Sequence, residues 1–308
     1  MLNIKTVTVL GANGTMGCNV SGIFASFGNA KVNLVCRDLE ISKKVVEKAA
    51  KSVKADSIVG NLIPKTYSDL KTCIEESDLI FESVAEDIDL KKDINIQMAK
   101  YVKTGTIIST GTSGLSINEL SKCFPKKIQP YYLGLHFYNP PYSMTLCEVI
   151  PSQYTSSKML VSLKDYLKRI LYRNAVEVKD APGFLGNRIG FQFINEALQC
   201  AEQYKDYGGI DYIDSILGPF TGRNMPPLAT SDFVGLDVHK AIVDNIYKNT
   251  NDYAHDAFCM SDYAIRLIED GKLGRKSGCG LYQILKHIDG RKTINVYDIL
   301  SGKYRLKE

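Results

Sequence analysis

The chain has 308 residues, of which 44% are hydrophobic and 23% charged, and its net charge is +4. This length allows two domains of ordinary size, and the composition is typical of a soluble globular protein. The lysines are scattered rather than gathered in a basic stripe, which argues against nucleic-acid binding, and no apolar run is long enough to cross a bilayer.

The eight cysteines and four histidines lie far apart along the chain. No C-x-x-C pair and no zinc-ligand spacing occurs, so we expect no metal centre. In a chain of this size such cysteines predict reduced, partly buried thiols, and the N-terminus lacks the pattern of a signal peptide. We therefore expect a cytoplasmic protein.

Residues 1–180 alternate short β-branched runs with amphipathic helical stretches. This rhythm predicts βαβ units and a parallel sheet, in a doubly wound, Rossmann-type α/β domain. Helices are expected over residues 40–53 and 90–101. The expected strands are residues 7–10, 32–36, 79–84, 106–110, 132–136, 146–150 and 175–178.

Pro182-Gly183 ends this rhythm, and the following residues are mainly helical. A terminal β-hairpin is expected from two apolar runs, residues 280–284 and 293–297, that flank Asp289-Gly290. The chain is therefore expected to form a dinucleotide-binding domain, residues 1–180, and a helical substrate and dimerisation domain, residues 181–308. The helices expected in the second domain are residues 184–203, 212–217, 235–249 and 257–269.

A glycine-rich turn follows the first expected strand and opens a helix. Glycines at this place let backbone N–H groups approach a pyrophosphate, whose charge the helix N-terminus favours. The spacing is G-x-x-G-x-x-G, one residue longer than the commonest fingerprint. Gly14 and Gly17 are expected to keep their roles. The residues expected to bind the dinucleotide here are Gly11, Asn13, Gly14, Thr15, Met16 and Gly17.

The end of the second expected strand bears on the choice between NAD and NADP. An acidic side chain there accepts a hydrogen bond from the adenosine ribose and selects NAD, whereas an arginine can hold a 2′-phosphate. Cys36 occupies the expected acidic position, Arg37 follows it and Asp38 comes next. We expect NAD, with NADP open because of Arg37, whose other expected role is to lie over the adenine face.

His136 closes the apolar run of residues 131–135, and a second apolar run, residues 144–150, carries one carboxylate, Glu148. A strand that ends in a histidine brings an imidazole to a sheet edge. If the next strand pairs with it, Glu148 can accept the ring N–H and fix the tautomer. The two residues would then form a general base and its orienting partner. The alternative is a histidine that caps a core strand, with Glu148 in a solvated turn.

Several segments are distinctive in combination. They are GTMG at 14–17, SDLIFESVAE at 77–86, TSGLSI at 112–117, GLHFYNP at 134–140, DAPGFLGNR at 180–188, DFVGLD at 232–237 and GKLGRKSGCGLY at 271–282. Together they resemble the L-3-hydroxyacyl-CoA dehydrogenase family over nearly the whole chain up to about residue 283. GPFTGR at 218–223 is most similar to the dehydrogenase part of large bacterial fatty-acid oxidation proteins.

The resemblance implies a reversible hydride transfer between C3 of a 3-hydroxyacyl thioester and the nicotinamide. It implies that His136 takes the proton from the 3-hydroxyl, while Glu148 orients His136 and stabilises its imidazolium. It also implies that Ser113 and Asn187 donate hydrogen bonds to the substrate oxygens.

The resemblance further places Glu86 and Lys91 around the cofactor ribose. Each assignment has a structural alternative. Ser113 is also suited to cap a helix that begins near residue 117, and Asn187 to pack within its own helix. Glu86 and Lys91 are also compatible with ordinary surface charges.

The chain departs from the family at two places. Gly111 stands where the family usually has asparagine, so one polar contact near the nicotinamide is expected to be missing. The segment between Cys36 and Asp78 has room for about one helix, where fatty-acyl members carry a long helical hairpin that touches CoA. The short segment favours, as an alternative, a dehydrogenase of the same family that acts on a non-CoA 3-hydroxy acid, such as a sugar acid or a carnitine-like compound. A non-catalytic dinucleotide-binding or sensor protein is a further alternative, against which the combination of Ser113, His136, Glu148 and Asn187 argues.

The second domain is expected to join two subunits in a homodimer. Its helices over residues 184–203 and 235–249 carry more apolar surface than a single layer should expose. No role is assigned to residues 284–308.

Overall fold

The structure is a computed structural model that describes residues 2–287 and 289–307. The chain divides into two units, residues 1–184 and 185–308. The boundary thus falls after Phe184, whereas the sequence placed it after Asp180. The dimerisation role expected for the second unit stays a prediction.

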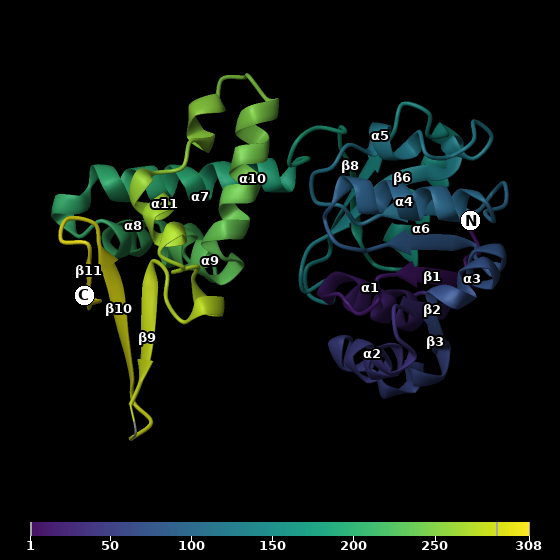
Figure 1. The fold of residues 1–308 in the computed structure, drawn as a ribbon, viewed down its shortest axis with the longest axis horizontal. Helices are drawn as coiled ribbons and strands as arrows, with labels where there is room; N and C mark the ends of the chain where they lie inside the picture. Colours follow the sequence, from purple (N-terminus) through teal and green to yellow (C-terminus); the bar gives the residue numbers. More distant parts are fainter. Residues whose placement is uncertain (1, 288, 308) are drawn as a thin grey trace. The chain divides into compact units, whose positions relative to one another are not determined.

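The first unit is built on an eight-stranded sheet with the order β3-β2-β1-β4-β5-β6-β7-β8 (Figure 1). This order, which runs outward in both directions from β1 and β4, confirms the doubly wound, Rossmann-type class. The strands are β1 (Thr6–Leu10), β2 (Lys31–Cys36), β3 (Leu62–Thr66), β4 (Leu79–Glu82), β5 (Ile107–Thr110), β6 (Tyr132–Phe137), β7 (Leu146–Pro151) and β8 (Asn174–Glu177).

The sheet is mixed, because β7 runs antiparallel to β6. The prediction of a parallel sheet was therefore wrong at this strand. Only residues 138–145 connect β6 to β7, and a parallel crossover needs a dozen or more residues, usually with a helix. The short connection places β7 beside β6 in the opposite direction, and this pairs His136 with Glu148 in register.

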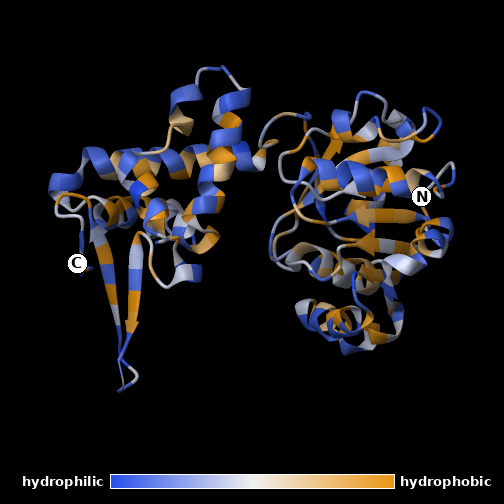
Figure 2. Ribbon diagram, viewed as in Figure 1, coloured by the Kyte–Doolittle hydropathy of each residue, from blue (hydrophilic) through white to orange (hydrophobic). Residues whose placement is uncertain are grey.

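Helices cover both faces of the sheet. Successive strand residues point to opposite faces, so Val9 packs in the cluster under α1, α2 and α6, and Leu10 packs in the cluster under α3, α4 and α5. Figure 2 shows mostly hydrophobic colours along the central strands, as expected for strands buried on both faces. The helices are α1 (Thr15–Ser26), α2 (Leu39–Ser52), α3 (Leu70–Glu76), α4 (Ile88–Ala99), α5 (Ile117–Ser121) and α6 (Ser157–Arg169).

The sequence reading missed two elements between Cys36 and Asp78, namely β3 and α3. Strand β3 contains Pro64, which cannot donate to a ladder and is tolerated at a sheet edge, where β3 lies. The segment therefore holds α2, β3 and α3, and among its residues, all of which are described, no long helical hairpin occurs.

The described part of the second unit packs five α-helices and a small sheet around its own core. The expected hairpin is confirmed by β9 and β10, and a third strand, β11, extends it in the order β11-β10-β9. Helix α9 was missed because it is short and begins at a proline. The elements are α7 (Gly186–Gln203), α8 (Ile210–Leu217), α9 (Pro227–Val234), α10 (Leu236–Asn249), α11 (Asp262–Glu269), β9 (Tyr282–Lys286), β10 (Lys292–Asp298) and β11 (Lys303–Leu306). Within residues 2–287 and 289–307, no helix has the length and apolar character needed to cross a membrane. The cytoplasmic location stays a prediction.

The glycines of the GKLGRKSGCGLY segment let the chain fold closely around Asp232. The Asp232 carboxylate accepts the N–H groups of Leu281 and Tyr282 at 2.7 and 2.8 Å. A Cβ on Gly280 would lie 2.3 Å from Asp232 Oδ1, and one on Gly274 would lie 2.3 Å from the Asp232 carbonyl oxygen. Only glycine fits at these two positions, so this part of the motif is structural.

His239 is held neutral in the core of the second unit. Its Nδ1 lies 2.9 Å from Ser231 Oγ, and its Nε2 lies 3.0 Å from Asn195 Oδ1. The Asn195 amide nitrogen donates to the carbonyl oxygens of Ala257 and Cys259. Asn195 Oδ1 therefore accepts, which places the proton of His239 on Nε2 and leaves Nδ1 to accept from Ser231.

Burial lowers the pKa of His239 from 6.5 to about 4. The unfolded chain binds this proton more readily, so the contribution of His239 to stability is present above pH 6.5 and is lost as the pH falls to about 4. Asp232 opposes this trend, because burial raises its pKa from 3.8 to about 6 and its contribution falls as the pH rises across that window.

We expect a His239→Gln protein to be less stable at pH 7 than the parent and to lose less stability on acidification. The difference in urea midpoint between the two proteins, followed from pH 7 to pH 4.5, isolates His239 because Asp232 is common to both. Parallel curves would show that His239 does not titrate in this range.

Candidate active site and cofactor pocket

A pocket of about 920 Å³ opens at the carboxyl ends of β1, β2 and β4. Six of the nine residues expected at the dinucleotide line it, namely Gly11, Asn13, Gly14, Thr15, Met16 and Arg37. Gly17, Glu86 and Lys91 are not among its lining residues. In open α/β sheets ligands bind at this end of the strands.

The glycine turn is shaped by close backbone approach. Gly11 has a φ of +73°, and a Cβ there would lie 2.5 Å from the Ser83 carbonyl oxygen. A Cβ on Gly17 would lie 2.6 Å from the Gly11 carbonyl oxygen, so Gly17 lets α1 pack directly under the turn. Gly14 is the N-cap of α1 and offers no capping side chain. The helix N-terminus is therefore open to the phosphates of a dinucleotide, which fits this cradle.

The end of β2, beside the pocket, carries an exposed cation but no acidic side chain at the position where a ribose-binding carboxylate is expected. Cys36 is buried and Arg37 is exposed at the pocket wall. Asp38 caps α2, because its Oδ1 accepts the N–H of Ile41 at 3.0 Å. Tyr67 also lines the pocket. The sequence reading missed it because it lies in the segment where β3 was not recognised.

Glu82, at the end of β4, is a buried carboxylate beside this pocket that binds several groups. Its side chain and that of Lys91 are each only 1% exposed, and the Lys91 ammonium lies 2.8 Å from Glu82 Oε1. Glu82 also accepts the Thr110 hydroxyl at 2.6 Å and the Val84 N–H at 2.7 Å. The interpretation of Lys91 as a surface charge was wrong. It neutralises a buried carboxylate that shapes the pocket wall.

Glu86 links the turn after β4 to the loop after β5. Its Oε1 accepts the Thr112 hydroxyl at 2.5 Å and the Ser113 N–H at 2.7 Å. The Lys91 ammonium lies 3.5 Å from its other oxygen. The N-cap of α5 is Ser116, so the interpretation of Ser113 as the helix cap was wrong. Ser113 instead lies in a loop whose backbone Glu86 anchors.

His136 and Glu148 meet across the antiparallel pair of β6 and β7. His136 Nδ1 lies 2.6 Å from Glu148 Oε2, and the Tyr138 hydroxyl donates to the same oxygen at 2.9 Å. A carboxylate only accepts, so Nδ1 carries the proton and Nε2 is left as the basic nitrogen. Glu148 is 1% exposed, so its placement in a solvated turn was wrong. The expected pairing is confirmed, and its catalytic role stays a prediction.

Aromatic rings limit the access of water to His136. The Tyr138 ring lies edge-on at 4.7 Å between centroids, and the Phe184 ring lies at 5.8 Å.

Gly111 packs closely against an aromatic ring, because a Cβ there would lie 2.7 Å from Phe81 Cζ. The Phe81 ring thus occupies the space that a side chain at position 111 would need.

Asn187 lies half-buried in the first turn of α7, in the second unit. Its predicted contact with the substrate stays a prediction, as do the substrate contact of Ser113 and the cofactor contacts of Arg37 and Glu86.

The sheet order, the glycine cradle and the carboxylate-oriented histidine define a dinucleotide-dependent oxidoreductase. Comparison with protein families gives the particular family. The NAD-binding domain of 3-hydroxyacyl-CoA dehydrogenase matches residues 6–181, and the C-terminal domain matches residues 183–284. The chain therefore belongs to the 3-hydroxyacyl-CoA dehydrogenase family, and its enzyme class and its NAD cofactor are confirmed.

The relatives cover nearly the whole chain. The mitochondrial hydroxyacyl-coenzyme A dehydrogenase of Sus scrofa is 31% identical over 295 residues and 91% of each chain. A probable 3-hydroxyacyl-CoA dehydrogenase of Bacillus subtilis is 28% identical over 91% of this chain but only 38% of that protein. The structure of (S)-3-hydroxybutyryl-CoA dehydrogenase from Ralstonia eutropha is 28% identical, with a TM-score of 0.78 over 90% of this chain and 98% of that one.

Proposed function

We propose that this enzyme interconverts an L-3-hydroxyacyl-CoA and the 3-ketoacyl-CoA with His136 as its general base and acid. The observation that carries the proposal is the buried contact of 2.6 Å between His136 Nδ1 and Glu148 at the carboxyl end of β6. Alcohol oxidation needs one base that takes the hydroxyl proton as the hydride leaves carbon. NAD, held in the pocket around Gly11, supplies the hydride acceptor.

The proton transfer and the positioning of the substrate are assigned to the chain's own residues. His136 Nε2 takes the proton of the 3-hydroxyl, and the carboxylate of Glu148 stabilises the imidazolium that results. The Tyr138 hydroxyl holds that carboxylate in place. In the reductive direction the proton returns to the oxygen of the 3-carbonyl. Ser113 and Asn187 donate hydrogen bonds to substrate oxygens and polarise that carbonyl.

We assign the contacts with NAD from the pocket around Gly11 and from the residues beside it. The glycine turn and the N-terminus of α1 hold the pyrophosphate, and Arg37 lies beside the adenosine end. Glu86 contacts the ribose and also fixes the Ser113 backbone. Lys91 acts through Glu82 and the turn that follows it, since its side chain is only 1% exposed.

The segment with α2, β3 and α3 is shorter than the helical hairpin that touches CoA in fatty-acyl members of the family. The substrate's acyl carrier therefore needs a direct test. We expect acetoacetyl-CoA to be reduced by NADH with a kcat/KM at least about 100-fold above that of free acetoacetate, since CoA supplies binding energy that a free acid lacks. NADH oxidation is the measurement. A preference for the free acid would favour a non-CoA 3-hydroxy acid as substrate, and no turnover with either would favour a sensor.

We also propose a homodimer formed through the second unit. Ile189 on α7 is 61% exposed, and Val238 and Tyr247 on α10 are also exposed. Apolar side chains on adjacent helices favour contact with a second copy. We expect light scattering to give about twice the mass of 34.2 kDa. A monomeric mass that does not change with concentration would contradict the dimer.

A further inference from the structure

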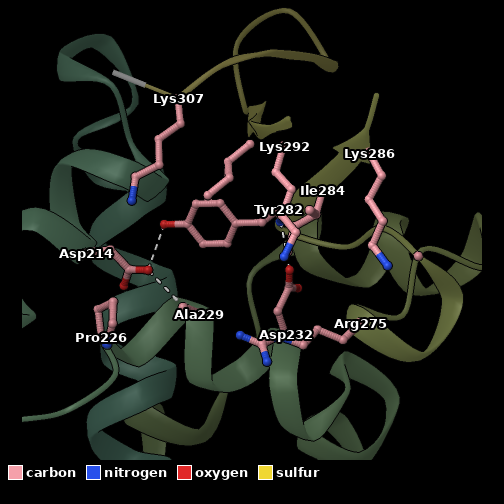
Figure 3. A pocket seen from close by; sticks show the side chains of 12 residues that line it. Asp214, Pro226, Ala229, Asp232, Arg275, Tyr282, Ile284, Lys286, Lys292 and Lys307 are labelled. Carbon is pink, nitrogen blue, oxygen red and sulfur yellow. Dashed lines mark hydrogen bonds between the residues drawn. The ribbon is translucent and has the colours of Figure 1, made fainter. Parts of the chain in front are cut away.

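The second unit contains a pocket of its own, of about 500 Å³ (Figure 3). Tyr282, Asp214 and Asp232 line it together with four basic side chains, and in this view Lys307 lies on the side of Asp214 and Lys286 on the opposite side. These cations are Arg275, Lys286, Lys292 and Lys307. The volume is in the range of small-molecule sites.

The two acidic side chains of the pocket are committed to the fold. Asp214 accepts the N–H groups of Leu228 and Ala229 and the hydroxyl of Tyr282, at 2.7 to 3.0 Å. Asp232 accepts two backbone N–H groups of the segment that leads into β9. These hydrogen bonds hold both carboxylates within the fold, and four cations lie in the same pocket as these two carboxylates.

The four basic side chains have no carboxylate partner within 4.0 Å among residues 2–287 and 289–307. The Lys307 ammonium lies 5.6 Å from the centre of the Tyr282 ring, and the Arg275 guanidinium lies 5.0 Å from that of Phe233. Other cations of the same unit are paired, such as Lys276 with Asp237. The charges of Lys307 and Arg275 still act at longer range on Asp214 and Asp232. The cations of the pocket that are furthest from compensation are therefore Lys286 and Lys292.

The register of β9 and β10 brings two of these charges together. Lys286 lies directly opposite Lys292 in the antiparallel pair, and Ile284 lies opposite Ile294 on the same face. All four side chains line the pocket. Like charges directly opposite one another destabilise a sheet. Such an arrangement is costly in the free protein and becomes favourable when an anion lies between the two ammonium groups.

This wall lies mostly beyond the segment that matches the family's C-terminal domain. The match to the C-terminal domain ends at residue 284, whereas Lys286, Lys292, Ile294 and Lys307 follow it. The strands that follow this match thus contribute to one side of the pocket. Beside the cations they offer apolar contacts from Ile294 and, within the match, from Ile284 and the Tyr282 ring.

We propose that this pocket binds a phosphorylated nucleoside. The phosphates lie between Lys286, Lys292 and Arg275, and the planar base packs against Tyr282 and the isoleucines. The ligand has two possible sources: a free nucleotide, or the adenosine 3′,5′-bisphosphate group that CoA carries. The site shares no residue with the cofactor pocket around Gly11.

The test is calorimetry on the full chain saturated with NADH, so that the cofactor pocket is filled. The probes are ATP, adenosine 3′,5′-bisphosphate, adenosine and pyrophosphate. We expect at least one nucleotide to bind about tenfold or more tightly than pyrophosphate or adenosine. Tighter binding of ATP identifies a free nucleotide, and tighter binding of the bisphosphate identifies the CoA nucleotide. Pyrophosphate that binds as tightly as both nucleotides, or no binding by either nucleotide, overturns the proposal.

Charge variants locate the site. Lys292→Glu replaces a repulsive pair with an attractive one, so we expect a higher unfolding temperature for the ligand-free protein together with about tenfold or greater loss of nucleotide affinity. Lys292→Gln is expected to weaken binding with less effect on stability. The matched control, Lys303→Glu on the same sheet but outside the pocket, is expected to bind as the parent does. Unchanged affinity in both Lys292 variants overturns the assignment, whether or not the enzyme reduces acetoacetyl-CoA.

Discussion

An enzyme with His136→Asn is expected to lose about two to four orders of magnitude in kcat with acetoacetyl-CoA and NADH, the range that general acid–base catalysis contributes. Asparagine still offers an N–H to Glu148, so the buried carboxylate keeps a donor and the fold is expected to survive. The KM for NADH is expected to change little, because His136 does not line the cofactor pocket. Full turnover by a folded His136→Asn protein would refute the mechanism.

Two further variants separate proton transfer from positioning. Glu148→Gln keeps a hydrogen-bonding group beside His136 Nδ1 but removes the charge that stabilises the imidazolium. A loss in kcat smaller than that of His136→Asn is expected, with KM values near those of the parent. Tyr138→Phe removes one hydrogen bond to Glu148 and leaves the ring in place, so its effect is expected to be the smallest of the three. A Tyr138→Phe protein as impaired as His136→Asn would contradict the supporting role assigned to the hydroxyl.

The second large effect concerns stability. We expect Lys91→Met to lower the free energy of unfolding by about 3–5 kcal/mol, because it leaves the carboxylate of Glu82 buried without its cation. Lys100→Met, an exposed position at the end of the same helix, is the matched control and is expected to change stability by less than about 0.5 kcal/mol. Urea unfolding of the three proteins is the measurement. Equal midpoints for the two variants would contradict the buried ion pair.

A double variant shows whether the loss is due to the unpaired charge. Glu82→Gln/Lys91→Met removes both charges, so it is expected to be more stable than Lys91→Met alone. Glutamine can still accept from Thr110 or from Val84, and the wall of the cofactor pocket is partly kept. We expect the KM for NADH to rise in Lys91→Met and to fall back toward the parent value in the double variant.

Much of the fold could be predicted because its cues are local. Gly11, Gly14 and Gly17 follow a strand and precede a helix within one short segment, and a turn of that kind has few structural solutions. His136 closes an apolar run and so was expected at a strand end. The Asp289-Gly290 turn between two apolar runs predicted the pairing of β9 with β10.

The elements missed by sequence reading have weak local patterns. Strand β3 contains Pro64, α9 begins at Pro227, and β11 is a short edge strand with alternating cations. Each is stabilised by the neighbour it packs on rather than by its own periodicity.

By itself the sequence determined the order of most of the elements, the dinucleotide turn and the residue types of a proton-transfer pair. Only the tertiary structure decided that β7 reverses beside β6, that Lys91 is buried against Glu82, and that Lys286 faces Lys292 in a pocket. The physical reason is that burial, ion pairing and strand register depend on contacts between residues distant along the chain. A local pattern of apolar and polar residues carries no record of the partner that a side chain will meet.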